Sequence, residues 1–322
     1  MKHLTNAFEG LNQWWRYLVL FLASFLGGQA IGGIPLFGVM IYKIFKSGGI
    51  IQPNPDNMSD LSVYGIDQNL GLILMILPFL FCLIILLLLF KPMHRRSYKV
   101  LISGVQKLRW SRFFVSGGIW ALLLAIYLFA DYSNNPSTYI WNFNIGPFIL
   151  LCLISLIFIP FQASYEEFLF RGYIAQGFGI WTKNRILVIL LPSVLFGLMH
   201  SFNPEVDAYG FLIVMPQYIL FGLLFGLLTV LDDGIEMAMG AHSANNIFMS
   251  IFVTSKSSVL QTPAMFEQQN IDPVRELIVL MIVSFIFLAI LSIIFKWNFR
   301  ILTKKIEPEN LGSIDVELLV KV

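Results

Sequence analysis

The chain has 322 residues, of which 57% are hydrophobic and only 12% are Asp, Glu, Lys or Arg, with a formal net charge of +2. Soluble globular chains carry about 25% charged residues, so this composition excludes a cytosolic enzyme, a disordered protein and a nucleic-acid binder. The two cysteines, Cys82 and Cys152, lie inside apolar runs, where cysteine behaves as a small hydrophobic residue. The sequence therefore predicts an integral membrane protein without a disulfide framework.

Apolar runs long enough to cross a bilayer recur along the chain. A run of roughly 18 or more mostly apolar residues is a candidate membrane helix. Such runs lie at residues 17–42, 69–90, 113–130, 145–168, 186–203, 210–231, 235–254 and 275–296. The first run lacks a small-residue cleavage site, so we expect a retained helix rather than a signal peptide. The prediction is an all-α, polytopic membrane protein with about eight transmembrane helices around a polar interior cavity.

The charge distribution predicts the orientation of these helices. Residues 91–112 contain seven Lys and Arg side chains and no acidic residue, and such segments stay on the cytoplasmic side of a membrane. Alternation over eight spans then places both termini in the cytoplasm. We expect the half from Lys99 to Arg112 to form an amphipathic helix against membrane lipid. The absence of an added targeting segment favours a bacterial inner (plasma) membrane.

We expect one membrane domain, because no repeat of fixed period, heptad or low-complexity tract is present. Three parts can be distinguished within it. Residues 1–144 hold the N-terminal transmembrane helices and the basic cytoplasmic loop 91–112. Residues 145–255 hold the polar positions described next, and residues 256–322 hold the last transmembrane helix and a polar cytoplasmic tail.

The fourth run contains two carboxylates and a guanidinium. Ionisable side chains within membrane spans cost at least about 2.5 kcal/mol each and therefore mark functional sites. Glu167 and Arg171 are four residues apart on one helical face and are expected to pair. Glu166 points about 100° away, so it can face a cavity and act as a general base. The competing interpretation is a charged helix end at the membrane surface.

Two further runs add polar residues. Phe196 and His200 share one helical face in the fifth run, and His242 and Asn246 share one in the seventh. Taken singly, His200 suits an interfacial position, and His242 with Asn246 suits a hydrogen-bonded contact between helices. Taken together, these groups could activate water and stabilise an oxyanion. The set Glu166, His200 and His242 could also hold a divalent metal such as zinc.

The three motifs occur in order on separate membrane runs, and they resemble those of the CPBP (CAAX protease and bacteriocin-processing) intramembrane protease family. That family includes the type II CAAX prenyl endopeptidases and the bacteriocin-processing or self-immunity proteins once grouped as abortive-infection proteins. The resemblance covers residues 145–255, which would form the catalytic core. The motifs that carry it are Glu166-Glu167-x-x-x-Arg171, Phe196-x-x-x-His200 and His242-x-x-x-Asn246.

The resemblance implies an eight-helix endopeptidase with a water-filled cavity, and it implies a role for each motif. Glu166 would activate water, with Glu167 and Arg171 as accompanying positions. The second motif would contribute a histidine, and the third would support water activation and the oxyanion. The residues concerned are His200, His242 and Asn246. Because the family is described both as metalloproteases and as glutamate-dependent proteases, the metal stays open.

One geometric condition must hold if these runs form one site. Glu166 lies near one end of its run, and His200 lies near the opposite end of the next. We expect Pro160 to break the fourth run, so that a helix restarts near Phe161 and continues past Gly172. We also expect the fifth run to extend beyond His200. Both side chains would then lie at mid-depth in the membrane. If neither adjustment holds, we expect the catalytic interpretation of the three runs to fail.

The sequence thus favours an intramembrane endopeptidase whose glutamate-activated water, with or without a metal, hydrolyses a peptide bond. Its substrate would be a membrane-associated peptide or a prenylated protein. A second hypothesis is a non-proteolytic membrane scaffold or bacteriocin self-immunity protein. A transporter is a third class, but it predicts similarly broken segments in two halves of the chain, and the sequence has no such correspondence.

Overall fold

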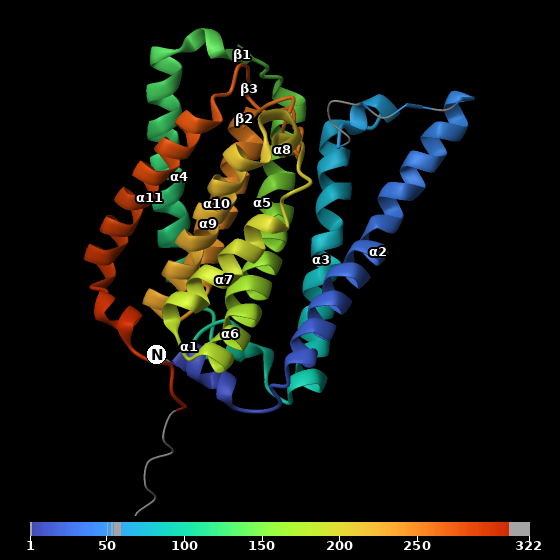
Figure 1. Cartoon of the computed structure of the whole chain (residues 1–322). Helices are drawn as coiled ribbons and strands as arrows, with labels where there is room; N and C mark the ends of the chain where they lie inside the picture. The colour runs from blue at the N-terminus through green and yellow to red at the C-terminus, as the bar shows by residue number, and fades with distance from the viewer. Residues whose placement is uncertain (1, 50, 53, 55–58, 309–322) are drawn as a thin grey trace, which may run out of the picture.

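The computed structural model describes residues 2–49, 51–52, 54 and 59–308 and is helical with a few short strands (Figure 1). Most of the polar tail expected at the end of the part 256–322 lies outside the described residues. The α-helices are α1 (Lys2–Thr5), α2 (Trp14–Ser47), α3 (Gln68–His94), α4 (Trp110–Asn134), α5 (Ile145–Glu167), α6 (Ala175–Thr182), α7 (Arg185–Leu198), α8 (Pro204–Tyr209), α9 (Phe211–Asp232), α10 (Glu236–Phe252) and α11 (Pro273–Phe295).

Shorter elements connect these helices. A π-helix, η5 (Phe168–Ile174), joins α5 to α6, and the strands β1 (Tyr139–Trp141), β2 (Val253–Thr254) and β3 (Phe266–Gln268) form one sheet in the order β1-β3-β2. Within this sheet, β3 is antiparallel to β1 and parallel to β2. The 3-10 helices are η1 (Asn6–Phe8), η2 (Leu61–Tyr64), η3 (Tyr98–Leu101), η4 (Pro136–Thr138) and η6 (Phe299–Thr303).

Several membrane helices begin at a side chain that caps their free backbone N–H groups. Asp67 caps α3, Asn184 caps α7 and Asp272 caps α11, each accepting hydrogen bonds from two backbone N–H groups in the first turn. Such caps satisfy donors that have no partner within the helix. These short polar residues therefore set where the apolar helices start.

The all-α, polytopic fold class is confirmed, whereas the expected number of eight spans is not. Among the described residues, six helical runs are long and apolar enough to cross a membrane, namely α2, α3, α4, the continuous run Ile145–Thr182, α9 and α11. The fifth expected run is α7, which is apolar but has only 14 residues. The seventh is α10, which has 17 residues and carries the polar side chains of the third motif.

The helix of the fourth run does not break at Pro160, so that expectation was wrong. It continues through the proline and η5 to Thr182, and it therefore does run past Gly172. The expected extension of the fifth run was also wrong, because α7 ends at Leu198 and His200 lies in the following turn. Pro204 follows shortly after, and a helix rarely continues up to the residue before a proline.

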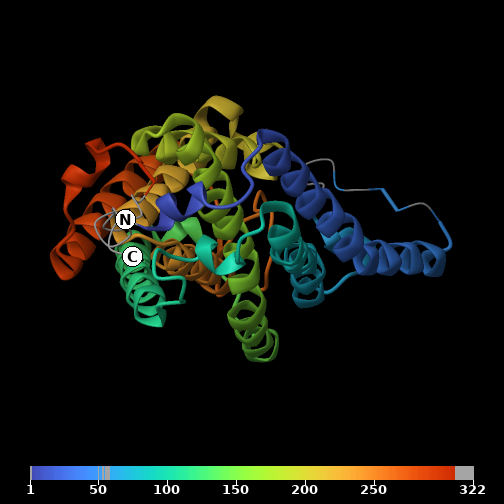
Figure 2. The same cartoon turned by 90° about the horizontal axis from the view of Figure 1, so that it is seen from below.

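The helix α10 occupies the inside of the bundle and packs against α4, α5 and α9, while α2 and α3 stand beside the bundle (Figure 2). Small residues make this central packing close. A Cβ atom added at Gly240 of α10 would lie 2.1 Å from the carbonyl oxygen of Phe113 in α4. Only glycine therefore permits this approach of the two helices.

The two ends of the described chain lie at the same end of the bundle (Figure 1). Leu4 and Ile306 belong to one apolar cluster, and the backbone N–H groups of Lys2 and His3 donate to Asp233. That both termini lie in the cytoplasm stays a prediction.

The segment 91–112 forms ion pairs instead of an amphipathic surface helix, so that expectation was wrong. It contains η3 and turns, and α4 starts only at Trp110. Arg109 binds both carboxylate oxygens of the buried Glu236, at 2.8 and 2.7 Å, and lies 3.0 Å from Asp232. The segment therefore fixes the junction between α9 and α10.

We predict that Arg109→Ala destabilises the protein by about 3 kcal/mol, because it leaves the buried Glu236 carboxylate unpaired. Thermal unfolding in detergent micelles measures this change. Lys107→Ala is the control, since Lys107 is an exposed cation in the same segment. Equal unfolding temperatures for the two variants would contradict the assigned role of Arg109.

Candidate active site

Four of the six predicted site residues line one interior cavity of about 610 Å³. Helices α5 and α10 and the turn after α7 position these residues, which are Glu166, His200, His242 and Asn246. These four polar side chains face a cavity whose lining is otherwise mostly apolar. The structure also shows that His200 reaches the site from a turn, so the longer fifth helix is not required.

The other two predicted residues lie behind the cavity wall and form the expected pair. Arg171 Nη1 lies 3.0 Å from Glu167 Oε1, and both side chains are buried. Arg171 Nη2 also donates to the carbonyl oxygen of Gly222 in α9, at 3.1 Å, and its guanidinium lies 4.5 Å from the centre of the Phe196 ring. A charged helix end at the membrane surface is therefore not what this motif forms.

His242 connects this pair to the cavity. Its Nδ1 lies 2.7 Å from Glu167 Oε1, and its Nε2 lies 3.7 Å from Glu166 Oε2. The imidazole stacks on Phe225 with ring centres 5.0 Å apart and an angle of 20° between the planes. Because a carboxylate accepts the Nδ1 proton, Nε2 is the atom presented to Glu166. The gap of 3.7 Å is too long for a direct hydrogen bond, and a water shared by the two atoms would have to lie to one side of them.

The two oxygens of Glu166 have different surroundings. Oε1 accepts a short hydrogen bond from Gln162 Nε2, whereas Oε2 is buried without a hydrogen-bond partner among the described residues. Gln162 in turn accepts from Asn246 Nδ2 at 2.9 Å. Since Oε1 is engaged by Gln162, Oε2 is the oxygen that keeps its capacity to accept a hydrogen bond.

His200 is held by its own helix and by a neighbouring ring. Its Nδ1 lies 2.7 Å from the carbonyl oxygen of Phe196, so this nitrogen carries the proton and donates. The imidazole stacks on Tyr218 of α9, with ring centres 4.4 Å apart. Nε2 is consequently the nitrogen left for a water or a substrate.

The donor set does not fit a resident metal ion. Within the described part of the chain, no three His, Cys, Asp or Glu side chains lie together as a metal-binding group. His242 and His200 each use Nδ1 for the contacts above and keep Nε2, but Glu166, His200 and His242 do not form a group of this kind. We therefore derive no chemical step through a metal.

Sequence reasoning missed several residues of the site. Gln162, Tyr218, Phe225 and Asn245 all line the cavity. Gln162 carried a usable signal, because it is a polar residue in an apolar run and lies four positions before Glu166 on the same helical face. The aromatic residues carried none, since aromatic side chains are common throughout these runs.

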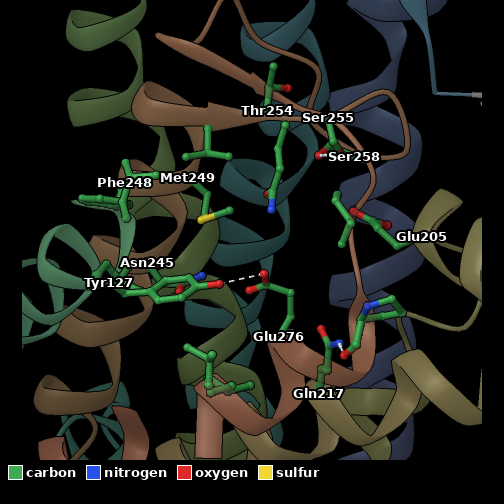
Figure 3. Close-up of a pocket in the computed structure, with 18 of the residues that line it drawn as sticks. Tyr127, Glu205, Gln217, Asn245, Phe248, Met249, Thr254, Ser255, Ser258 and Glu276 are labelled. Atoms are coloured by element: carbon green, nitrogen blue, oxygen red, sulfur yellow. Dashed lines mark hydrogen bonds between the residues drawn. The ribbon is translucent and has the colours of Figure 1, made fainter. Parts of the chain in front are cut away.

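A second cavity of about 290 Å³ lies between α4, α9, α10 and α11 (Figure 3). Tyr127 donates to Glu276 there at 2.8 Å. Asn245, Met249 and Glu205 line both cavities and so form part of the wall between them. Burial raises the pKa of the Glu205 carboxyl above its ordinary value.

The fold is a helical membrane bundle with adjacent carboxylates, histidines and an amide around a cavity. These features define a class of polytopic membrane proteins with a hydrolase-like site. The type II CAAX prenyl endopeptidase Rce1-like family matches residues 145–248. The chain is also 30% identical over 292 residues to the uncharacterized protein YyaK of Bacillus subtilis (strain 168), covering 90% of this chain and 95% of that protein.

The chain belongs to the type II CAAX prenyl endopeptidase Rce1-like family. The matched residues include all six predicted site positions, so the resemblance seen in the sequence is confirmed. Membership indicates an integral membrane protein with protease activity of the CAAX type. No solved structure matches the chain significantly.

We predict that Arg171→Met lowers the free energy of unfolding by about 3–5 kcal/mol, because it leaves the buried Glu167 carboxylate without its cation. Thermal unfolding in detergent checks this value. Arg95→Met is the control, since Arg95 is exposed. A decrease in the free energy of unfolding no larger than that of Arg95→Met would mean that the ion pair of Glu167 and Arg171 does not hold η5 in place.

Proposed function

We propose that this protein is an intramembrane endopeptidase in which Glu166 activates the hydrolytic water. The observation that carries the proposal is the arrangement around His242. One of its nitrogens is bound by Glu167, and the other lies 3.7 Å from the unpartnered oxygen of Glu166, beside the cavity. A water that lies beside both atoms would contact a base and an imidazole at once.

The reaction follows from these positions. Glu166 Oε2 takes a proton from the water while the water oxygen attacks the peptide carbonyl carbon. The carbonyl oxygen becomes an oxyanion, to which the free N–H of the Asn246 amide donates, as does His242 Nε2 when it carries a proton. The C–N bond then breaks, and Glu166 returns its proton to the leaving amine. The products are a carboxylic acid and an amine, and transfer of the acid's proton to the amine gives a carboxylate and an ammonium group.

The other residues prepare these groups. Glu167 orients His242, and Arg171 balances the charge of Glu167. His200 would position the water or the substrate through Nε2. The proposed substrate is a membrane-associated peptide or a prenylated protein, because the cavity combines this polar site with apolar walls such as Ile76 and Phe79 of α3.

The proposed location is a bacterial inner membrane with both termini in the cytoplasm. The basic segment 91–112 lies at the same end of the bundle as the two ends of the described residues, which share one apolar cluster through Leu4 and Ile306 (Figure 1). Positive charge favours the cytoplasmic side. Exposed apolar side chains along α2, α4 and α11 would contact membrane lipid, for example Phe37, Ile126 and Phe285.

We predict that Glu166→Gln and His242→Ala each reduce kcat about 10²- to 10⁴-fold, as expected when a general base or its partner is removed. Cleavage of a panel of fluorogenic prenylated peptides by purified protein measures the effect. Glu9→Gln is the control, since Glu9 is exposed far from the cavity. Equal cleavage by all forms would overturn the site, and a cellular phenotype that survives Glu166→Gln would favour the scaffold or immunity hypothesis.

We predict that a chelator such as EDTA or phenanthroline leaves the rate of wild-type cleavage unchanged, because no metal-binding group of three side chains forms among the described residues. The same fluorogenic assay, run before and after dialysis against chelator, measures this. Loss of activity that added zinc restores would contradict the prediction. It would show that the histidines converge on a metal in the active enzyme.

A further inference from the structure

We propose that Gln162, which belongs to none of the three motifs, is a positioning residue that sets the orientation of Glu166 through a chain of side-chain hydrogen bonds. The inference rests on the proposed function, in which Glu166 is the base. It adds the side chains Trp120 and Asn245 as the far end of the same chain.

The chain of hydrogen bonds links side chains of the three helices α4, α10 and α5. Trp120 Nε1 in α4 donates to Asn245 Oδ1 at 3.2 Å, and Asn245 Nδ2 in α10 donates to Asn246 Oδ1 at 3.0 Å. Asn246 Nδ2 donates to Gln162 Oε1 in α5 at 2.9 Å, and Gln162 Nε2 donates to Glu166 Oε1. In every one of these bonds the donor lies on the Trp120 side and the acceptor on the Glu166 side.

Both ends of the chain fix this direction. The indole of Trp120 can only donate, and an ionised carboxylate can only accept. Each amide between them therefore turns its oxygen toward Trp120 and its NH₂ group toward Glu166. The last bond is charge-assisted, and bonds that run in one direction strengthen one another.

Burial makes the two ends of the chain of hydrogen bonds rigid. The Trp120 side chain is fully buried in the contact of α4 with α9 and α10, and Gln162 and Glu166 are only 9% and 6% exposed. Asn245 and Asn246 are half-buried at the cavity, so burial limits competition from water mainly at the two ends of the chain of hydrogen bonds. The ends of the chain lie in different helices, which couples the packing of α4 to the position of the base.

The consequence for the reaction is a division between the two oxygens of Glu166. Oε1 is held by Gln162, and Oε2 stays without a partner beside His242. The same chain uses one N–H of the Asn246 amide and leaves the other for the oxyanion. Gln162 thus aligns the base and the oxyanion donor together.

A purely structural role for Gln162 would predict an unchanged reaction rate in a variant that keeps the size of the side chain. If Gln162 only filled space, a side chain of equal length without polar atoms would preserve the rate. Gln162→Met is such a change, because methionine is unbranched and similar in length. It removes the donor to Glu166 and the acceptor for Asn246 in one step.

The kinetic test compares Gln162→Met with Gln217→Met on the fluorogenic peptides. We expect Gln162→Met to lower kcat about 10- to 100-fold with KM changed less than about twofold, as for loss of a hydrogen bond to a charged group. Gln217 is a matched control, because its amide donates to the Pro273 carbonyl and takes no part in the chain of hydrogen bonds that ends at Glu166. The inference would be overturned by a kcat equal to that of the control, or by a rise in KM as large as the fall in kcat.

The spectroscopic test needs no substrate. In a ¹H–¹⁵N spectrum of the whole protein in micelles, Trp120→Phe identifies the Trp120 indole N–H signal. We expect this signal to shift in Gln162→Met and in Gln162→Glu, and to stay in place in Gln217→Met. An unchanged signal in a folded Gln162 variant would contradict the proposed chain of hydrogen bonds. Gln162→Glu is a near-isosteric variant that serves if Gln162→Met fails to fold.

The two tests separate failure of this inference from failure of the proposed function. If the wild type cleaves no peptide while the Trp120 signal responds to Gln162, the chain stands and the protease reaction is wrong. If the wild type cleaves peptides and Gln162→Met cleaves them equally well, the reaction stands and the positioning role is wrong.

Discussion

The rest of the structure depends on one buried charge arrangement, in which Glu167 accepts from both Arg171 and His242. A charge removed from water is tolerated only with a partner and further hydrogen bonds. Those partners come from different helices: the carbonyl of Gly222 in α9 for the guanidinium, and the imidazole in α10 for the carboxylate. The helices around the cavity must therefore keep their relative positions, because any displacement would leave a buried charge unpaired.

The same constraint explains why hydropathy did not yield the number of membrane helices. A helix in contact with lipid must be apolar, whereas a helix enclosed by protein can carry polar groups that its neighbours satisfy. The interior helix α10 is of the second kind, and its Asn245 and Asn246 bind each other and side chains of α4 and α5. The short α7 can end at Leu198 because the turn that follows places His200 at the cavity.

Local sequence spacing was sufficient where one helix supplied both partners. The pairing of Glu167 with Arg171 and the direction of Glu166 away from that pair followed from the helical repeat alone, although the contact of Glu166 with Gln162 was missed. Contacts between elements distant in the chain were not predictable in this way. Arg109 looked like a lipid-facing cation because its partners, Asp232 and Glu236, lie more than a hundred residues later. Such pairing depends on how α4, α9 and α10 pack, which the segment 91–112 does not encode by itself.

Glu166 and Glu167 are adjacent and chemically identical, yet their neighbours give them different roles. Glu167 is bound by a cation and an imidazole, so its charge is balanced and its position is fixed. Glu166 is bound through one oxygen by a neutral amide and keeps the other oxygen free. An amide holds a carboxylate without neutralising it, which preserves its capacity to accept a proton. A cation in place of Gln162 would give the two glutamates the same surroundings, and the difference between base and support would disappear.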